Sequence, residues 1–284
     1  MSVSPSAAPF GERLERAVEE RQSQVVLGLD PDPERLWPGA DDVLGHCRAV
    51  IDAAGPACVA VKPQLACFER LGPEAWSVLH GVADHTRARG LLVLLDGKRG
   101  DVPVTARAYA QALVGSLRSD AFTVNPLLGR DALAPLVDAA RGAGAAPFVL
   151  VRTSNPGAAD LMDLELAGGE RLWERLARLV ADLGAPGQAR SGLADVGAVT
   201  GATAPEHLAR MRELMPHTPF LLPGVGAQGG DVRSLGPAFA PGRAGGLVTA
   251  SRSIANAHEE HGGSPAQAAR REAERLRELA WALA

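Results

Sequence analysis

Eight short apolar runs alternate with amphipathic stretches along the chain, and this alternation limits the possible folds more than any other feature. The runs are near-continuously apolar, as is typical of strands that are covered on both faces. They span residues 25–30, 58–63, 91–96, 121–125, 148–153, 196–201, 220–226 and 246–251. Alternating strands and helices predict a parallel sheet, and eight such units predict a (β/α)8, or TIM, barrel, with a doubly wound sheet as the alternative.

The segments between the runs carry helical periodicity, most clearly at 107–117, 130–142 and 170–184. Gly142 and Gly184 are expected to end two of these helices. No domain boundary is visible in the 284 residues, so we expect one barrel domain over residues 10–284, preceded by a disordered tail at residues 1–9. Residues 154–169 form the longest non-periodic stretch and are expected to be a loop at the carboxyl-terminal rim of the barrel.

Composition excludes several classes of protein. The formal net charge is −4, which argues against a dedicated nucleic-acid binder. No apolar run approaches the ~18 residues of a membrane span, and the first residues do not resemble a signal peptide. Cys47, Cys58 and Cys67 have no CxxC spacing and are expected to be reduced. We therefore expect a cytoplasmic protein that binds neither membrane nor nucleic acid.

The lysines of the chain are concentrated at one predicted end of the barrel. Lys62 and Lys98 are the only lysines, and the other 27 cationic side chains are arginines. Lys62 ends the second predicted strand, Lys98 follows the third, and Asp30 ends the first. Active sites of this fold lie at the carboxyl ends of the strands. Arginine cannot replace lysine where a proton must leave the cation, so the two lysines are candidate site residues.

The cluster DGKRGD, from Asp96 to Asp101, is the densest motif. It places the Lys98 ammonium between two carboxylates, so that alternating charges keep one another ionised. Such an array can stabilise a carbanion and supply a proton. The alternative is a solvated salt bridge worth ~1 kcal/mol or less, although the buried strand leading into the cluster favours a site.

A second motif predicts an anion site. The glycine-rich run PGVGAQGGD, residues 223–231, is followed by Arg252 at the end of the eighth predicted strand. The loops after strands seven and eight are the usual phosphate site of this barrel, and Arg252 would hold the phosphate. The alternatives are a plain turn and a surface ion pair. No metal-ligand spacing, P-loop or nucleophile elbow occurs, so we expect neither a metal nor a cofactor.

These motifs resemble those of the orotidine 5′-phosphate decarboxylase family. DGKRGDVPVT, residues 96–105, is similar to the family's D-x-K-x-x-D-I-x-x-T pattern, with Val102 in place of the usual isoleucine. VKPQLACFE after the second strand and RTSNPG after the fifth resemble the longer bacterial branch (type 2). Ser251 stands where the shorter branch often has glycine.

The resemblance implies roles for the charged residues. Asp30 and Lys62 would contact the ribose hydroxyls, with Lys62 also pairing with Asp96. Asp96 would lie against the substrate carboxylate, and Lys98 would donate a proton to C6. Catalysis would need no metal or cofactor, because electrostatic stabilisation and a proton suffice for this chemistry.

The resemblance also implies where the substrate is held. Ser154 would bind the pyrimidine edge, Gln228 would bridge toward the phosphate, and Arg252 would clamp it. The protein would be a homodimer in which Asp101 and Thr105 cross the interface to complete the partner's site.

Three rival functions remain open from the sequence. Sister decarboxylases and synthases of sugar phosphates hold magnesium at an acidic residue at the end of the second strand. This chain has Lys62 there, which would repel a cation. A Schiff-base aldolase would use Lys62 or Lys98 as nucleophile. A phosphosugar-binding protein would have the same charged array but would catalyse no reaction.

Overall fold

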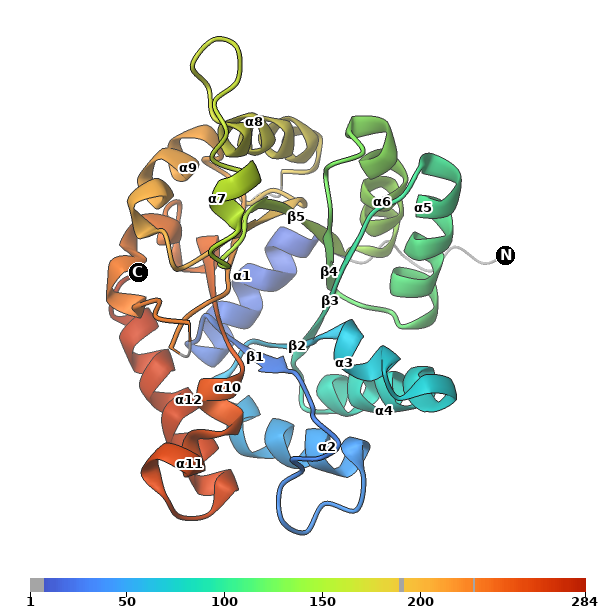
Figure 1. Ribbon diagram of the computed structural model, residues 1–284, viewed down its shortest axis with the longest axis vertical. Coiled ribbons are helices and arrows are strands. Elements are labelled where there is room, and N and C mark those ends of the chain that lie inside the picture. Colours follow the sequence, from blue (N-terminus) through green and yellow to red (C-terminus); the bar gives the residue numbers. More distant parts are fainter. Residues whose placement is uncertain (1–7, 189–191, 227) are drawn as a thin grey trace.

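The eight apolar runs form a closed parallel barrel in the computed structural model, which describes residues 8–188, 192–226 and 228–284 (Figure 1). Each strand pairs with the next, and the last pairs with the first through Val25 and Val248. The predicted (β/α)8 barrel is therefore confirmed. The strands are β1 (Val25–Leu29), β2 (Ala60–Pro63), β3 (Leu92–Arg99), β4 (Ala121–Val124), β5 (Ala146–Arg152), β6 (Gly197–Thr200), β7 (Phe220–Leu222) and β8 (Gly246–Ala250).

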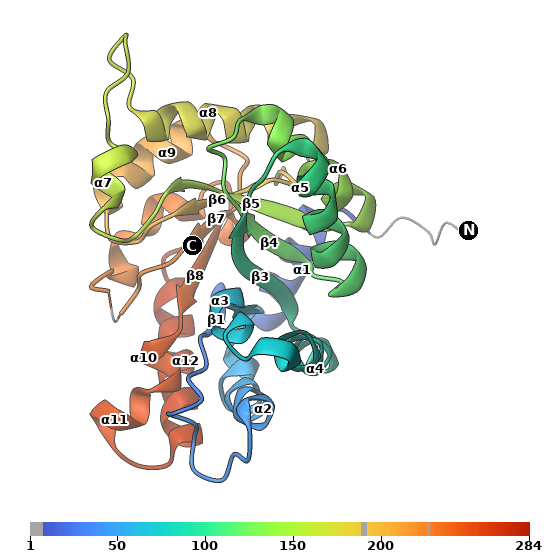
Figure 2. The same cartoon turned by 45° about the vertical axis from the view of Figure 1, so that its right-hand side comes forward.

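Helices surround the barrel, and most of them bury apolar side chains in a core that they share with the strands (Figures 1 and 2). None of the helices in the described parts of the chain has both the length and the apolar character that a membrane span requires. The helices are α1 (Phe10–Arg21), α2 (Val43–Ala54), α3 (Leu65–Glu69), α4 (Ala75–Ala88), α5 (Pro103–Ala110), α6 (Arg130–Ala143), α7 (Ala158–Leu161), α8 (Leu172–Gly184), α9 (Leu208–Leu214), α10 (Arg252–Ala255), α11 (Ala257–His261) and α12 (Pro265–Trp281).

Helix α1 covers the amino-terminal end of the barrel and leaves the opposite end open. Its buried residues Phe10, Leu14 and Val18 pack against the inward side chains of the strands, including an edge-to-face contact between Phe10 and Phe148. In Figure 1, α1 lies behind the strands. The polar residues that follow the strands therefore collect at the uncovered end.

The expected helix end at Gly142 was wrong, and the expected helix at 107–117 and loop at 154–169 differ from the structure in detail. The expected helix at 107–117 starts earlier, as α5, and continues from Gln111 to Ser116 in wider π-type turns. Gly142 lies inside α6, and it is Gly144, with a φ of 65°, that ends the helix in the left-handed conformation. The predicted loop at 154–169 follows β5 but contains the short helix α7. Most of the expected tail at residues 1–9 lies outside the described residues, which begin at Ala8.

Candidate active site

A cavity of about 470 Å³ opens at the carboxyl ends of the strands. Seven of the nine residues that the sequence suggested for the site line it, and they come from six different strand ends. They are Asp30, Lys62, Asp96, Lys98, Ser154, Gln228 and Arg252. Hydrophobic side chains of Val199 and Leu221 contribute to the same lining. The side chains of residues far apart in the sequence thus converge on one site, as this fold requires.

The centre of the cavity is a lysine–aspartate–lysine array. Lys62 Nζ donates to Asp96 Oδ2 at 2.8 Å, and Lys98 Nζ donates to Oδ1 at 2.6 Å. The side chains of Lys62 and Asp96 are 5 % and 9 % exposed, whereas that of Lys98 is 41 % exposed. Burial raises the pKa of Asp96, but the two ammonium groups outweigh it and hold the pKa well below its usual range. Asp96 is therefore a carboxylate, and Lys98 is the more accessible of the two cations.

Two further groups complete the hydrogen bonding of Asp96, and sequence reasoning gave neither of them a role. Gln64 Nε2 donates to Oδ2 at 3.3 Å, and Thr123 Oγ1 donates to Oδ1 at 2.9 Å. Both side chains line the cavity. Gln64 could have been found as the polar residue that directly follows β2, whereas Thr123 is visible in the sequence as the polar residue of an otherwise apolar β4, without a role.

The backbone around Lys98 departs from regular strand geometry. The predicted third strand ends at Asp96, but β3 continues to Arg99, and its register with β4 shifts between Leu95 and Arg99. Lys98 has a φ of 47°, a left-handed conformation that is uncommon for a residue with a side chain. The strand therefore carries Asp96 and Lys98 to the cavity in a bulge rather than a flexible loop.

The rim opposite the array joins the loops after β5 and β7. Ser154 Oγ donates to Gln228 Oε1 at 2.8 Å, and Thr203 Oγ1 donates to the Ser154 carbonyl at 2.9 Å. Gly224, with a φ of 102°, lies so close to Ser154 that a Cβ atom there would be 2.9 Å from the serine Cβ. The glycine-rich run thus lets its backbone approach the Ser154 loop closely.

Arg252 begins α10 directly after β8 and lines the mouth of the cavity. Its side chain has no ion-pair partner within the described ranges of the chain, which leaves its guanidinium available to an anion. The Ser251 hydroxyl is directed at β1, since a Cβ atom on Gly28 would be only 1.8 Å from the Ser251 Oγ. Gly28 therefore makes room for Ser251, the residue that departs from the shorter branch's pattern.

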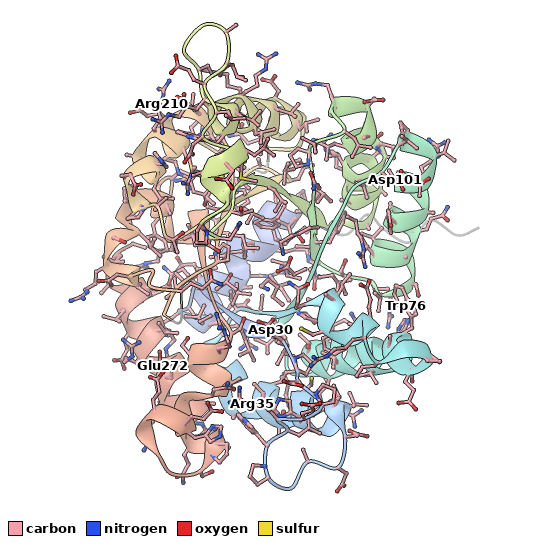
Figure 3. The ribbon with its side chains drawn as sticks, viewed as in Figure 1. Asp30, Arg35, Trp76, Asp101, Arg210 and Glu272 are labelled. Atoms are coloured by element: carbon pink, nitrogen blue, oxygen red, sulfur yellow. The ribbon has the colours of Figure 1, made fainter. Side chains whose placement is uncertain are left out.

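Asp101 and Thr105 do not line this cavity. Asp101 Oδ1 accepts a hydrogen bond from the neighbouring Val102 N–H at 2.7 Å, and Thr105 is exposed on α5. Figure 3 shows Asp101 on the α5 side of the molecule and Asp30 toward the middle of the ring of helices. The geometry therefore does not support a role for Asp101 or Thr105 in the cavity of their own chain.

No group of three or more histidine, cysteine, aspartate or glutamate side chains that could hold a metal ion occurs among the described residues. Near the carboxyl end of β2, where a carboxylate could serve as a magnesium ligand, the chain has the Lys62 ammonium. The donor set of the cavity is thus suited to an anion rather than to a divalent cation.

Comparisons with known proteins agree with this arrangement. Residues 23–271 match the family model described as "Orotidine 5'-phosphate decarboxylase / HUMPS family". The orotidine 5′-phosphate decarboxylase of Deinococcus radiodurans is 45 % identical over 249 residues, which cover 86 % of this chain and 88 % of that protein. This coverage extends the likeness well beyond the motifs.

Solved structures show the same fold. A structure from Streptomyces avermitilis, provisionally identified as an orotidine 5′-phosphate decarboxylase, is 34 % identical with a TM-score of 0.85, covering 98 % of this chain and 97 % of that one. The Leishmania donovani UMP synthase is 32 % identical with a TM-score of 0.79, and the match covers 96 % of this chain but only 57 % of that longer protein. The chain belongs to the orotidine 5′-phosphate decarboxylase / HUMPS family.

Proposed function

We propose that this chain decarboxylates orotidine 5′-phosphate to UMP, a lyase step of pyrimidine biosynthesis, without a metal ion or cofactor. The observation that carries the proposal is the Lys98 ammonium, which lies 2.6 Å from a buried carboxylate and remains accessible from the cavity. The 45 % identity to a bacterial orotidine 5′-phosphate decarboxylase supports the substrate.

The proposed chemistry follows from the charges of the array. Loss of CO2 breaks the bond between C6 and the carboxylate carbon and leaves the electron pair on C6. Lys98 stabilises this negative charge and then transfers its proton to C6, which gives UMP and a neutral amine that takes a proton from water. Asp96, ionised and placed against the substrate carboxylate, repels it in the ground state and loses that repulsion as CO2 leaves. Lys62 balances the charge of Asp96.

The rest of the cavity would bind the parts of the substrate that do not react. Asp30 and Lys62 would contact the ribose hydroxyls, Ser154 the pyrimidine edge, and Gln228 and Arg252 the phosphate. The hydrogen bond between Ser154 and Gln228 supports this assignment, because it links the base and phosphate ends of the cavity. Binding energy from the remote phosphate could then be used to orient the reacting ring.

An absorbance assay of the purified protein with orotidine 5′-phosphate, with and without EDTA, tests the proposal. We expect loss of the orotate absorbance at the same rate in both samples. The metal-dependent alternative in the same family, which acts on sugar phosphates, would instead show no turnover of orotidine 5′-phosphate and would need magnesium. Turnover that EDTA abolishes would contradict the metal-free mechanism but not the substrate.

The active form would be a homodimer in which Asp101 and Thr105 reach the partner's cavity. Four exposed apolar side chains support an interface beside these residues, at the ends of the adjacent strands β3 and β4. Val102 is 52 % exposed, Val104 70 %, Leu127 70 % and Leu128 45 %. A symmetric pairing through this surface would bring Asp101 of each chain to the other's site.

Mixing two inactive variants tests the shared site. Lys98→Arg and Asp101→Asn chains, refolded together, would form heterodimers with one site free of both changes. We expect recovery of up to about a quarter of the wild-type activity, because half of the dimers in a random mixture are mixed and each contains one intact site. No recovery in a mixture shown to contain heterodimers would overturn the shared site.

A further inference from the structure

Thr123 makes two hydrogen bonds that join the two reacting groups of the array. Its hydroxyl donates to Asp96 Oδ1 at 2.9 Å and accepts from the Lys98 backbone N–H at 2.9 Å. The side chain is 1 % exposed, and β4 holds it in place through its pairing with β5 at Phe148. One buried hydroxyl therefore contacts both the carboxylate and the backbone of the proton donor.

The Lys98 backbone needs such a partner. At Lys98 the chain leaves the regular β3–β4 ladder, since the register shifts between Leu95 and Arg99. The Lys98 N–H lies in a partly buried position, where an N–H without an acceptor costs free energy, and a left-handed φ at a lysine persists only when surrounding contacts hold it. The Thr123 hydroxyl replaces the missing ladder acceptor.

The hydroxyl also holds the carboxylate in one orientation. Lys98 Nζ and Thr123 Oγ1 both donate to the same oxygen, Asp96 Oδ1, while Lys62 and Gln64 donate to the other. A carboxylate with donors on both oxygens has little freedom to rotate. The distance from Lys98 Nζ to the reacting carbon of a bound substrate would thus depend on Thr123 through both the backbone and the carboxylate.

We infer that Thr123 is a positioning residue that sets the geometry of Asp96 and Lys98 for proton transfer. The inference rests on the proposed function for its kinetic consequence, but the hydrogen bond to the Lys98 amide can be tested without any substrate. Thr123 is not placed against the phosphate or ribose subsites, so its loss would impair the chemical step rather than binding.

The kinetic test compares Thr123→Val, which keeps the shape but removes the hydroxyl, with Thr123→Ser, which keeps the hydroxyl. We expect Thr123→Val to lower kcat by about 10- to 100-fold, because small displacements of reacting groups have effects of this order. KM should change less than about threefold, and Thr123→Ser should restore kcat to within about threefold of wild type.

Thr200→Val is the matched control, because the Thr200 hydroxyl is also buried at a strand end but makes no hydrogen bond within the described residues. It should leave kcat within about threefold of wild type. Equal losses in Thr123→Val and Thr200→Val, or a loss that Thr123→Ser does not restore, would overturn the positioning role.

The second test uses the fact that the chain has only two lysines. Protein labelled with ¹⁵N-lysine would give two backbone amide signals, from Lys62 and Lys98. Hydrogen exchange of the Lys98 amide should be slow in the wild type and about tenfold or more faster in Thr123→Val, with Lys62 as the internal reference. A wild-type Lys98 amide that exchanges like an unprotected peptide would refute the inference even if Thr123→Val failed to fold. Wild-type protein inactive on orotidine 5′-phosphate but protected at Lys98 would refute only the proposed function.

Discussion

The two ends of the barrel each hold cations, but the cations find their hydrogen-bond acceptors in opposite ways. At the carboxyl end, Lys62 and Lys98 share one carboxylate, Asp96, and face a cavity. At the amino end, the Arg212 guanidinium, from α9, donates to four backbone carbonyls and lies 3.8 Å from the centre of the Phe220 ring. The acceptors are the carbonyls of Met215, Thr218, Ala238 and Gly245, at 2.6–3.0 Å.

This difference separates a cation that is available to a ligand from one whose hydrogen bonds are used within the fold. Arg212 binds the chain just before β7 and just before β8, and burial lowers its pKa to about 9, which still leaves it charged at neutral pH. Its four terminal hydrogen bonds leave little capacity for a ligand. Lys98 Nζ has one acceptor among the described residues and three N–H groups, so it retains donors for a ligand. A cation with unused hydrogen-bond donors at the open, carboxyl end of the barrel is therefore what distinguishes the candidate site from the amino end.

At the carboxyl end of the barrel, Lys98→Arg should have the largest effect, a loss of activity. Arginine keeps the charge beside Asp96 but does not release a proton near neutral pH, so we expect kcat to fall by at least about 10³-fold. The free energy of unfolding should change by less than ~1 kcal/mol, because the side chain is half exposed. The assay with orotidine 5′-phosphate and urea unfolding measure the two effects. Substantial activity in this variant would remove Lys98 as the acid.

Arg212→Ala, at the amino end, should lower the stability of the protein and leave its activity unchanged. Four buried carbonyls lose their donor, and we expect the free energy of unfolding to fall by roughly 4 kcal/mol with kcat of the folded protein unchanged. Arg210→Ala is the control from the same helix, because Arg210 is exposed and its ion pairs with Glu174 and Glu213 are worth ~1 kcal/mol or less. Figure 3 shows Arg210 at the outside of the molecule. Equal losses of stability in the two variants would show that Arg212 has no special role.

The sequence predicted the carboxyl end better than the amino end, for a physical reason. Strand positions follow from local apolar patterning, and the barrel then places Asp30, Lys62 and Asp96 together without further information. Arg212 looks like any other arginine of an amphipathic helix, because its four acceptors come from three separate segments. Its burial depends on tertiary packing that no local pattern records.

The same limit applies inside the site. The motif DGKRGD identified Asp96 and Lys98, but the bulge that gives Lys98 its positive φ depends on the pairing of β3 with β4. Thr123 was visible only as a polar residue at a strand end, since its two hydrogen bonds exist only after the strands meet. Glycine positions were similarly ambiguous, because Gly142 and Gly144 are both plausible helix ends by sequence.

Arg252→Ala extends the comparison to the mouth of the cavity, where the Arg252 guanidinium has no ion-pair partner in the part of the chain that the structure describes. Loss of a charge-assisted hydrogen bond to phosphate is worth about 1.5–3 kcal/mol, so KM should rise by roughly 10- to 100-fold. The free energy of unfolding should stay within ~0.5 kcal/mol of wild type. Steady-state kinetics of purified protein measure the change, and an unchanged KM would rule out Arg252 as a phosphate ligand.

The charge of Asp96 should be detectable in the acid stability of the protein. Because the lysines lower its folded-state pKa, its contribution is fully present above the unfolded pKa of about 4 and is lost as pH falls toward the folded value. Between pH 4 and 3 the wild type should therefore lose about 1 kcal/mol more than Asp96→Asn, which cannot titrate. Urea unfolding at both pH values measures the difference. Parallel losses would mean that Asp96 is not held ionised by its neighbours.

Gln24→Met, at the amino end of the barrel, should have the smallest effect, a small gain in stability. Gln24 is fully buried directly before β1, and neither the nitrogen nor the oxygen of its side-chain amide has a hydrogen-bond partner within the described residues. Replacing an unpaired buried amide by an apolar side chain of similar volume should stabilise the protein by about 1 kcal/mol and leave kcat unchanged. The effect should appear as a higher urea midpoint with the same m-value. A lower midpoint would mean that ordered water forms hydrogen bonds with the amide. Gln24 would then be a second buried polar side chain at the amino end that, like Arg212, has hydrogen-bond partners.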